Sequence, residues 1–109
     1  MVKYSDYELD QVFSALSDPT RRRVAEALSD GEKTLTDLAR PFQMTMPAVM
    51  KHVAVLEKSG ILRTEKRGRT RYCRLDPNRL TDAQEWLART SRMWTERLNS
   101  LDRFLKENP

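Results

Sequence analysis

The chain has 109 residues and a net charge of +4, which suits one domain with a single modest core rather than two. No apolar run approaches the roughly 18 residues of a membrane span, and the N-terminus lacks a signal-peptide pattern, so we expect a cytoplasmic protein that does not enter a membrane. One cysteine, Cys73, and one histidine, His52, exclude an internal disulfide, a cysteine-cluster zinc site and a multi-histidine metal site within one chain.

Positive charge is concentrated in the middle of the chain. Residues 40–74 contain nine Lys or Arg and two Asp or Glu, a local net charge of +7, whereas the remainder has a net charge of −3. A basic segment in an otherwise acidic chain favours an anionic polymer, a nucleic acid, bound by one face. The alternative, a solvated charged surface, would not predict this segregation.

A first helix is predicted over about residues 6–16, because Ser5 and Glu8 fit a capping box ahead of an apolar stripe. Asp18 and Pro19 then provide the N-cap and first-turn proline of a second helix. Three arginines follow in its first turns, where the helix dipole disfavours cations. They could pair with nearby acids or with a phosphate, and the sequence leaves both open.

A short third helix is predicted to start at Leu35 and Thr36, with Thr36 as its cap and Pro41 limiting its length. Gln43 and Met44 form the turn into the next helix. Two short helices joined by a tight turn, the second with a basic face, are typical of a helix-turn-helix.

The next helix is predicted between Thr45, its N-cap, and Gly60, whose left-handed backbone would end it. Apolar Val49, Val53 and Leu56 recur at helical spacing and should face the core. The opposite face is almost free of acids, so we interpret this helix as the one that reads DNA. Its outward side carries Pro47, Met50, Lys51, Ala54 and Lys58.

Residues 61–67 and 70–75 predict a β-hairpin that turns at Gly68. Its tip, residues 66–71, holds four cations in six residues. Arginine suits phosphate because its planar fork donates two hydrogen bonds at once, so the hairpin is interpreted as a wing beside the reading helix. The alternative is that these cations only protect an edge strand from aggregation.

A long last helix is predicted from about Thr81 to Lys106, after Asp76 and Pro77 break the strand. Such a helix is about 39 Å long, more than a small domain covers by itself. Its heptad-spaced apolar stripe predicts a two-fold dimer contact with the first helix, although packing on its own domain is the alternative. The expected contact residues are Leu9, Val12, Phe13, Leu87, Trp94, Leu98, Leu101 and Leu105.

Four segments carry a family resemblance: ALSDPTRRRVAEAL, LTDLARPF, PAVMKHVAVLEKSGIL and RGRTRYCRLDP. In this order they resemble the ArsR-type winged-helix repressors of bacteria, over about residues 8–76. The resemblance implies a mostly α fold with a small β-hairpin, ordered helix-helix-helix-helix-strand-strand-helix, in a single domain over residues 1–109. It also implies a homodimer, joined through residues 78–107 and the first helix, whose reading helices enter successive major grooves about 34 Å apart.

Departures from the family pattern concern the regulatory signal. Metal-sensing members carry a Cys-x-Cys pair in the third helix, and the corresponding positions here are Thr34 and Thr36. Threonine is a poor ligand for soft metals, and the last helix has no histidine, so we expect neither a metal site nor a cofactor. Cys73 should be a small buried residue, although its neighbouring arginines leave a redox role open.

The DNA side of the reading helix is also less polar than in many relatives. Met46 and Met50 can offer apolar contact, for instance to a thymine methyl, and Lys51 is the best donor to a base. Thr45 and His52 flank this face, although a packed or capping role is the alternative for His52. The residues expected to contact DNA are Thr45, Met46, Pro47, Met50, Lys51, His52, Lys58, Arg67, Arg69 and Arg71.

These features together predict a sequence-specific regulator of transcription, a repressor by family implication, that binds double-stranded operator DNA as a homodimer. The alternatives are a protein-interaction module that uses the last helix, or a regulator that responds to redox state or to a small ligand. An enzyme is disfavoured, because the sequence has no second histidine, no glycine-rich phosphate loop and no nucleophile–base motif.

Overall fold

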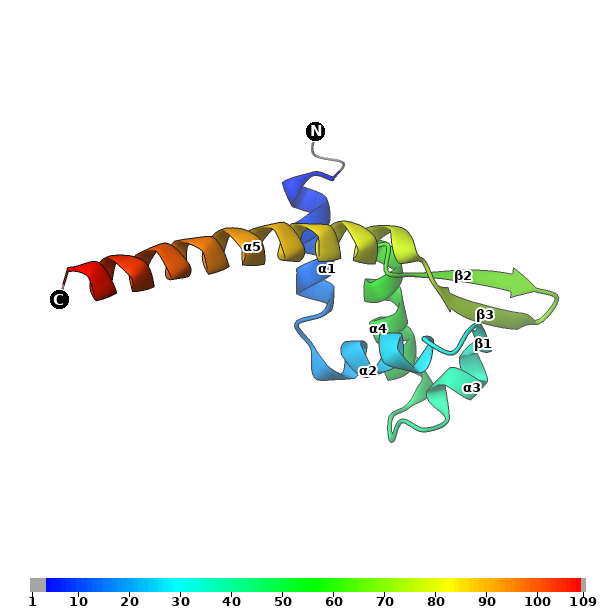
Figure 1. The fold of residues 1–109 in the computed structure, drawn as a ribbon. Helices are drawn as coiled ribbons and strands as arrows, with labels where there is room; N and C mark the ends of the chain where they lie inside the picture. The colour runs from blue at the N-terminus through cyan, green and yellow to red at the C-terminus, as the bar shows by residue number, and fades with distance from the viewer. Residues whose placement is uncertain (1–3, 109) are drawn as a thin grey trace.

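The computed structural model describes residues 4–108, which form five helices and a small sheet. Figure 1 shows the long last helix leaving the body on one side and the β-hairpin leaving it on the other. The principal extents are therefore unequal, at 68 × 33 × 23 Å. The elements are α1 (Asp6–Ala15), α2 (Pro19–Ala27), β1 (Lys33–Thr34), α3 (Leu35–Ala39), α4 (Met46–Lys58), β2 (Leu62–Arg67), β3 (Thr70–Leu75) and α5 (Pro77–Glu107).

The core lies where α1, α2 and α4 meet the inner ends of the strands. Its largest fully buried side chains are Val12, Val24, Leu28, Leu38, Val49, Leu56, Ile61, Leu62 and Cys73. Burial raises the pKa of the Cys73 thiol, so the group stays protonated and lacks the exposure that a redox switch needs. Its predicted role as a small buried residue is confirmed.

The sheet has three antiparallel strands in the order β1-β3-β2, with Gly68 at a φ of +65° in the β2–β3 turn. The predicted hairpin is confirmed, whereas β1 was not predicted because its two residues are too few to show alternation. The N-cap of α3 is Thr34, at the end of β1, so the predicted cap is wrong by two residues. The Thr34 hydroxyl accepts from the backbone N–H of Asp37 at 3.1 Å, in the place predicted for Thr36.

Two arginines of α2 hold it against the end of α1. Asp18 caps α2 as predicted, accepting from the backbone N–H of Arg21 at 2.9 Å. The Arg21 side chain donates through Nε to the carbonyl of Ala15 at 2.6 Å, and Arg22 donates to the carbonyl of Leu16 at 2.7 Å. These cations therefore satisfy carbonyls that a helix C-terminus leaves free.

Helix α5 begins at Pro77, four residues before the predicted start at Thr81. The Asp-Pro pair does not merely break the strand, because Asp76 caps α5 by accepting from the backbone N–H of Asn78 at 3.1 Å. The buried Asp76 carboxylate also accepts from Nε of Arg63 at 2.6 Å. Both bonds stabilise its ionised form and hold its pKa below the usual 3.8.

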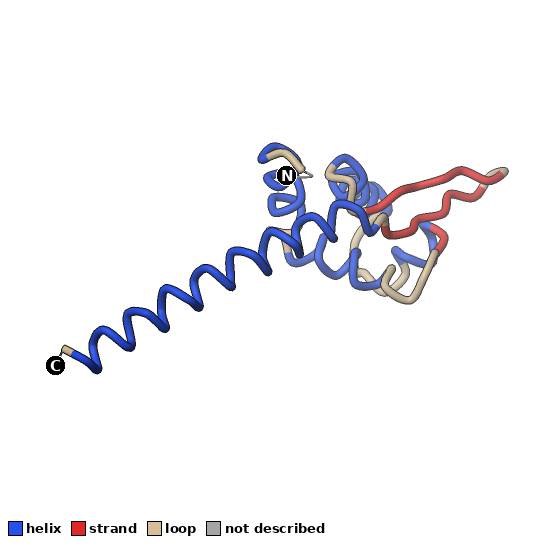
Figure 2. The backbone as a smooth tube through the Cα atoms, turned by 45° about the horizontal axis from the view of Figure 1, so that its top comes forward, coloured by secondary structure: helices blue, strands red, loops and turns tan. Residues whose placement is uncertain are grey.

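Most of α5 projects beyond the body, as Figure 2 shows from a second direction. Its first turns pack on α1, where Phe13 meets Trp86 edge-on with ring centroids 5.7 Å apart. Leu9 and Val12 are only 7% and 1% exposed, so they belong to the protomer's own core, and their assignment to a dimer contact is corrected. None of the helices within residues 4–108 is long and apolar enough to cross a membrane.

Replacing Arg21 by alanine should lower the free energy of unfolding by about 1–2 kcal/mol, because carbonyls at the end of α1 lose their donor. Arg23→Ala is the matched control, since the Arg23 side chain is exposed and makes no hydrogen bond within residues 4–108. Urea titration measures both variants. Equal stability of the two would contradict this role for Arg21.

Asp76 should contribute stability that depends on pH. Because its pKa is lower in the folded protein, the contribution is complete at neutral pH and is lost as the pH falls from about 5 through the lowered pKa. Asp76→Asn keeps an oxygen for the cap but cannot ionise. The midpoint temperature of thermal unfolding should therefore fall less steeply for the variant than for the wild type as the pH is lowered from about 5 to about 3. Parallel curves for the two proteins would refute the assignment.

Candidate nucleic-acid interface

Helix α4 has the boundaries and the buried side predicted from the sequence. The Thr45 hydroxyl accepts from the backbone N–H of Ala48 at 3.3 Å, and Gly60 follows the helix with a φ of +82°. Val49, Val53 and Leu56 are buried in the core. Burial of this stripe fixes which side of α4 faces solvent.

The solvent-facing side of α4 carries both apolar and basic groups. Met46 and Met50 are 38% and 48% exposed, and Lys51 and Lys58 are exposed as well. Met44, in the turn before the helix, extends the methionine surface and was not among the predicted contacts. It was missed because it lies outside the helical pattern on which the prediction rested.

His52 lies on a different side of α4 from the exposed methionines. Its side chain is only 21% exposed, and Nδ1 is 3.8 Å from Oδ2 of Asp18, the cap of α2. The imidazole therefore packs against the start of α2, which favours the packed role, and its contact with DNA stays a prediction.

Arg67, in the wing, is occupied by contacts within the protein. Its guanidinium donates to both carboxylate oxygens of Glu32, at 3.0 and 2.8 Å, and to Glu65 at 2.9 Å. It also stacks over the Tyr72 ring, with 4.5 Å between Cζ and the ring centroid. The Arg67 hydrogen bond lowers the pKa of Glu65, so the acid stays ionised beside it. Arg67 thus holds the wing to the segment before β1.

Arg71 also makes a contact inside the protein. Its Nη1 donates to the Thr64 hydroxyl at 3.0 Å, and Thr64 in turn is bonded to Glu57 of α4. By contrast, the exposed side chains of Lys66 and Arg69 make no hydrogen bond or ion pair with any part of residues 4–108. Of the three predicted wing arginines, Arg69 is therefore the one whose guanidinium has no partner within these residues.

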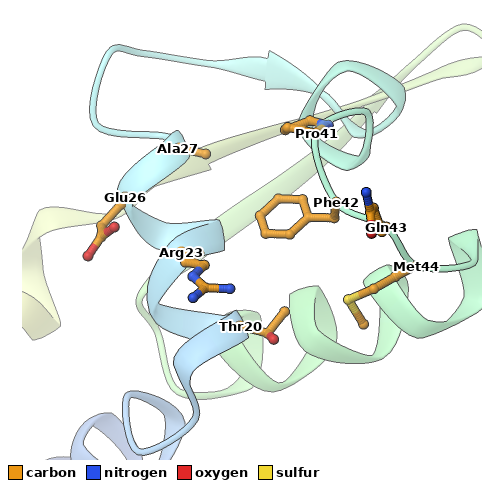
Figure 3. A pocket seen from close by; sticks show the side chains of 8 residues that line it. All are labelled: Thr20, Arg23, Glu26, Ala27, Pro41, Phe42, Gln43 and Met44. Atoms are coloured by element: carbon orange, nitrogen blue, oxygen red, sulfur yellow. The ribbon is translucent and has the colours of Figure 1, made fainter.

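A hollow beside the helix-turn-helix adds a feature that the sequence did not predict. Figure 3 shows the Phe42 ring projecting into it from the turn, with Arg23 opposite on α2. The lining mixes apolar and charged groups and comes from two segments about 20 residues apart, so no local pattern could reveal it. The residues that line it are Thr20, Arg23, Glu26, Ala27, Pro41, Phe42, Gln43 and Met44.

Helices α3 and α4 form a helix-turn-helix, and the antiparallel hairpin of β2 and β3 lies beside the basic face of α4. This arrangement defines a winged helix-turn-helix protein. Comparison with known proteins agrees, because the model of a helix-turn-helix domain family matches residues 16–65. The transcriptional repressor SdpR of Bacillus subtilis is 30% identical over 79 residues, which cover 72% of this chain and 88% of that protein. The HTH-type transcriptional regulator Rv2034 of Mycobacterium tuberculosis is 34% identical over 89 residues, covering 82% and 80%.

The structural comparison specifies the family. The crystal structure of an ArsR family transcriptional regulator superposes on this chain with a TM-score of 0.79. The two sequences are 43% identical, and the match covers 87% of this chain and 97% of that chain. The chain belongs to the ArsR family and is a DNA-binding transcriptional regulator.

Proposed function

We propose that the protein acts as a homodimeric repressor that covers a two-fold operator and has no metal-sensing site. The observation that carries the proposal is the position of two uncovered surfaces at opposite ends of the protomer. The α4 face and the wing form a basic surface, and α5 carries an apolar stripe that the protomer leaves in solvent. Figure 1 shows the wing and the C-terminal part of α5 leaving the body on opposite sides.

The apolar stripe of α5 supports self-association. At about 100° per residue, Leu87, Trp94, Leu98, Leu101 and Leu105 fall within one narrow sector of the helix. These side chains are 50–65% exposed in the protomer. An apolar surface of this extent is expected to be covered, and a second copy in two-fold symmetry covers the same stripe on both chains at once.

The basic surface supports DNA binding through a division of roles. Arg69, Lys66 and Lys58 supply phosphate contacts, which give most of the affinity and make it sensitive to salt. Met50 and Lys51 touch base edges, and the methionine favours a half-site that contains thymine. Arg67 holds the wing rather than the DNA, because its guanidinium already pairs with two carboxylates. Arg71 makes one hydrogen bond, to a neutral hydroxyl, and keeps donors for a phosphate.

The absence of a metal sensor in this proposal rests on the chemistry of Thr34 and Thr36. The Thr34 hydroxyl accepts the hydrogen bond that caps α3, so it serves the fold. A hydroxyl in either place is also a poor ligand for the soft metals that thiolates bind.

Three substitutions should separate phosphate contacts from base contacts. Arg69→Ala should weaken binding to all duplexes about equally and reduce the salt slope by about 1, whereas Lys51→Ala and Met50→Ala should change sequence preference. Selection from a random duplex library measures sequence preference, and fluorescence anisotropy measures affinity. Arg92→Ala, on the side of α5 opposite the apolar stripe, is the charge control. Equal loss on selected and random duplexes for Lys51→Ala would falsify the base contact.

Substituting one leucine of the stripe should separate the two chains. Leu98→Lys should shift the protein to monomer, because the exposed leucine is needed only for the contact between chains. Asn99→Lys adds the same charge one residue away, on another side of the helix, and should remain dimeric. Sedimentation velocity measures both variants, and a monomeric wild-type protein would exclude the dimer.

A further inference from the structure

The acidic residues of the basic segment have roles in holding the wing. Residues 40–74 contain only two acids, Glu57 and Glu65. A carboxylate beside a phosphate-binding surface weakens binding by like-charge repulsion. Each acid nevertheless accepts hydrogen bonds from the wing, so each offsets its unfavourable charge with a structural contact.

Glu57 joins the reading helix to the root of the wing. Its Oε2 accepts from the backbone N–H of Thr64 at 3.0 Å and from the Thr64 hydroxyl at 2.7 Å. Arg71, on β3, donates to the same hydroxyl at 3.0 Å. One carboxylate therefore connects α4 with β2 directly and with β3 through Thr64.

The position of Thr64 explains why a side chain from α4 can make this contact. Strand β2 lies at the edge of the sheet, so one of its sides has no neighbouring strand. Glu57 supplies the acceptor that a neighbouring strand would give to the Thr64 N–H. Glu57 is seven residues after Met50, which places both residues on the same side of α4, beside the wing.

A shallow groove between α4 and the wing contains this contact. Met50, Val53 and Ala54 line it from α4, and Thr64 and Arg71 line it from the wing. The exposed Met50 thus lies between the base-reading surface and the wing. Any change in the angle of the wing would move the phosphate-binding cation relative to Met50.

On its outer side the wing is held by Arg67, which pairs with Glu65 in its own strand and with Glu32 before β1. The inner contact at Glu57 and the outer contact at Arg67 restrain the hairpin from both sides. Arg69 follows Gly68 in the turn and therefore lies at the free end of this restrained hairpin.

We propose that Glu57 is a positioning residue for operator recognition: it fixes the wing relative to the reading helix, so that Arg69 meets a phosphate while Met50 and Lys51 meet their bases. The inference rests on the proposed function, in which α4 and the wing bind one duplex. Glu57 then has two opposing effects. Its charge repels every duplex, and its hydrogen bonds favour the duplex that fits the fixed wing.

The test compares three single variants at the Glu57–Thr64 contact on two DNA probes, and it also combines Glu57→Ala with Arg69→Ala. The probes are a duplex that the wild-type protein enriches from a random library and a scrambled duplex of the same length and composition. Glu57→Ala removes charge and acceptor, Glu57→Gln removes only the charge, and Thr64→Val removes only the hydroxyl. Hydrogen exchange at the Thr64 amide, measured without DNA, reports the contact itself.

Glu57→Ala should lower the ratio of selected to scrambled affinity about tenfold, the loss expected for a hydrogen bond to a charged group. It should also speed exchange at the Thr64 amide. Glu57→Gln should bind both probes more tightly and largely retain the ratio, since its amide oxygen still accepts. Arg69→Ala should cost less affinity in the Glu57→Ala background than in the wild type, because an unfixed wing has already lost part of that contact.

An unchanged ratio in Glu57→Ala, with enrichment by the wild type intact, would overturn this inference alone. Additive losses for Glu57→Ala and Arg69→Ala, or unchanged exchange at Thr64, would also overturn it. If the wild-type protein enriches no duplex, the proposed function fails and this inference fails with it. The thermal midpoints of the variants should fall by no more than a few degrees, because each variant loses only one or two hydrogen bonds at the surface.

Discussion

Burial of one stripe of α4 is the constraint on which the interface depends. Val49, Val53 and Leu56 pack into the core, and their burial leaves α4 only one orientation. Met50 and Lys51 must then face solvent, and the strand that follows Gly60 must start beside the last turn of the helix. An apolar interaction inside the protein thus decides which polar and apolar groups DNA can meet.

Hydrogen bonds to charged groups complete the arrangement around that helix. Arg21 joins α2 to the end of α1, Asp76 starts α5 beside β2, and Glu57 and Arg67 hold the wing on its two sides. One of these contacts uses a charge, that of Arg67, which the sequence assigned to DNA. In the proposed function the protein divides its basic residues between holding the fold and meeting phosphate, and net charge alone overstates the binding surface.

The parts of the fold that the sequence predicted are those governed by local rules. The caps at Ser5, Asp18 and Thr45, the stripe of α4 and the turn at Gly68 each depend on residues a few positions apart. Contacts between distant residues could not be predicted in the same way. Arg67 meets Glu32 across 35 positions, and β1 forms only because β3 pairs with it. The DNA contacts and the dimer stay predictions.

Hydroxyl-radical footprinting of the wild-type protein on its selected duplex tests the central claim most directly. A homodimer that uses α4 and the wing predicts two protected segments, related by two-fold symmetry and about one helical turn apart. Protection of a single segment, or of no segment at moderate salt, would contradict the account.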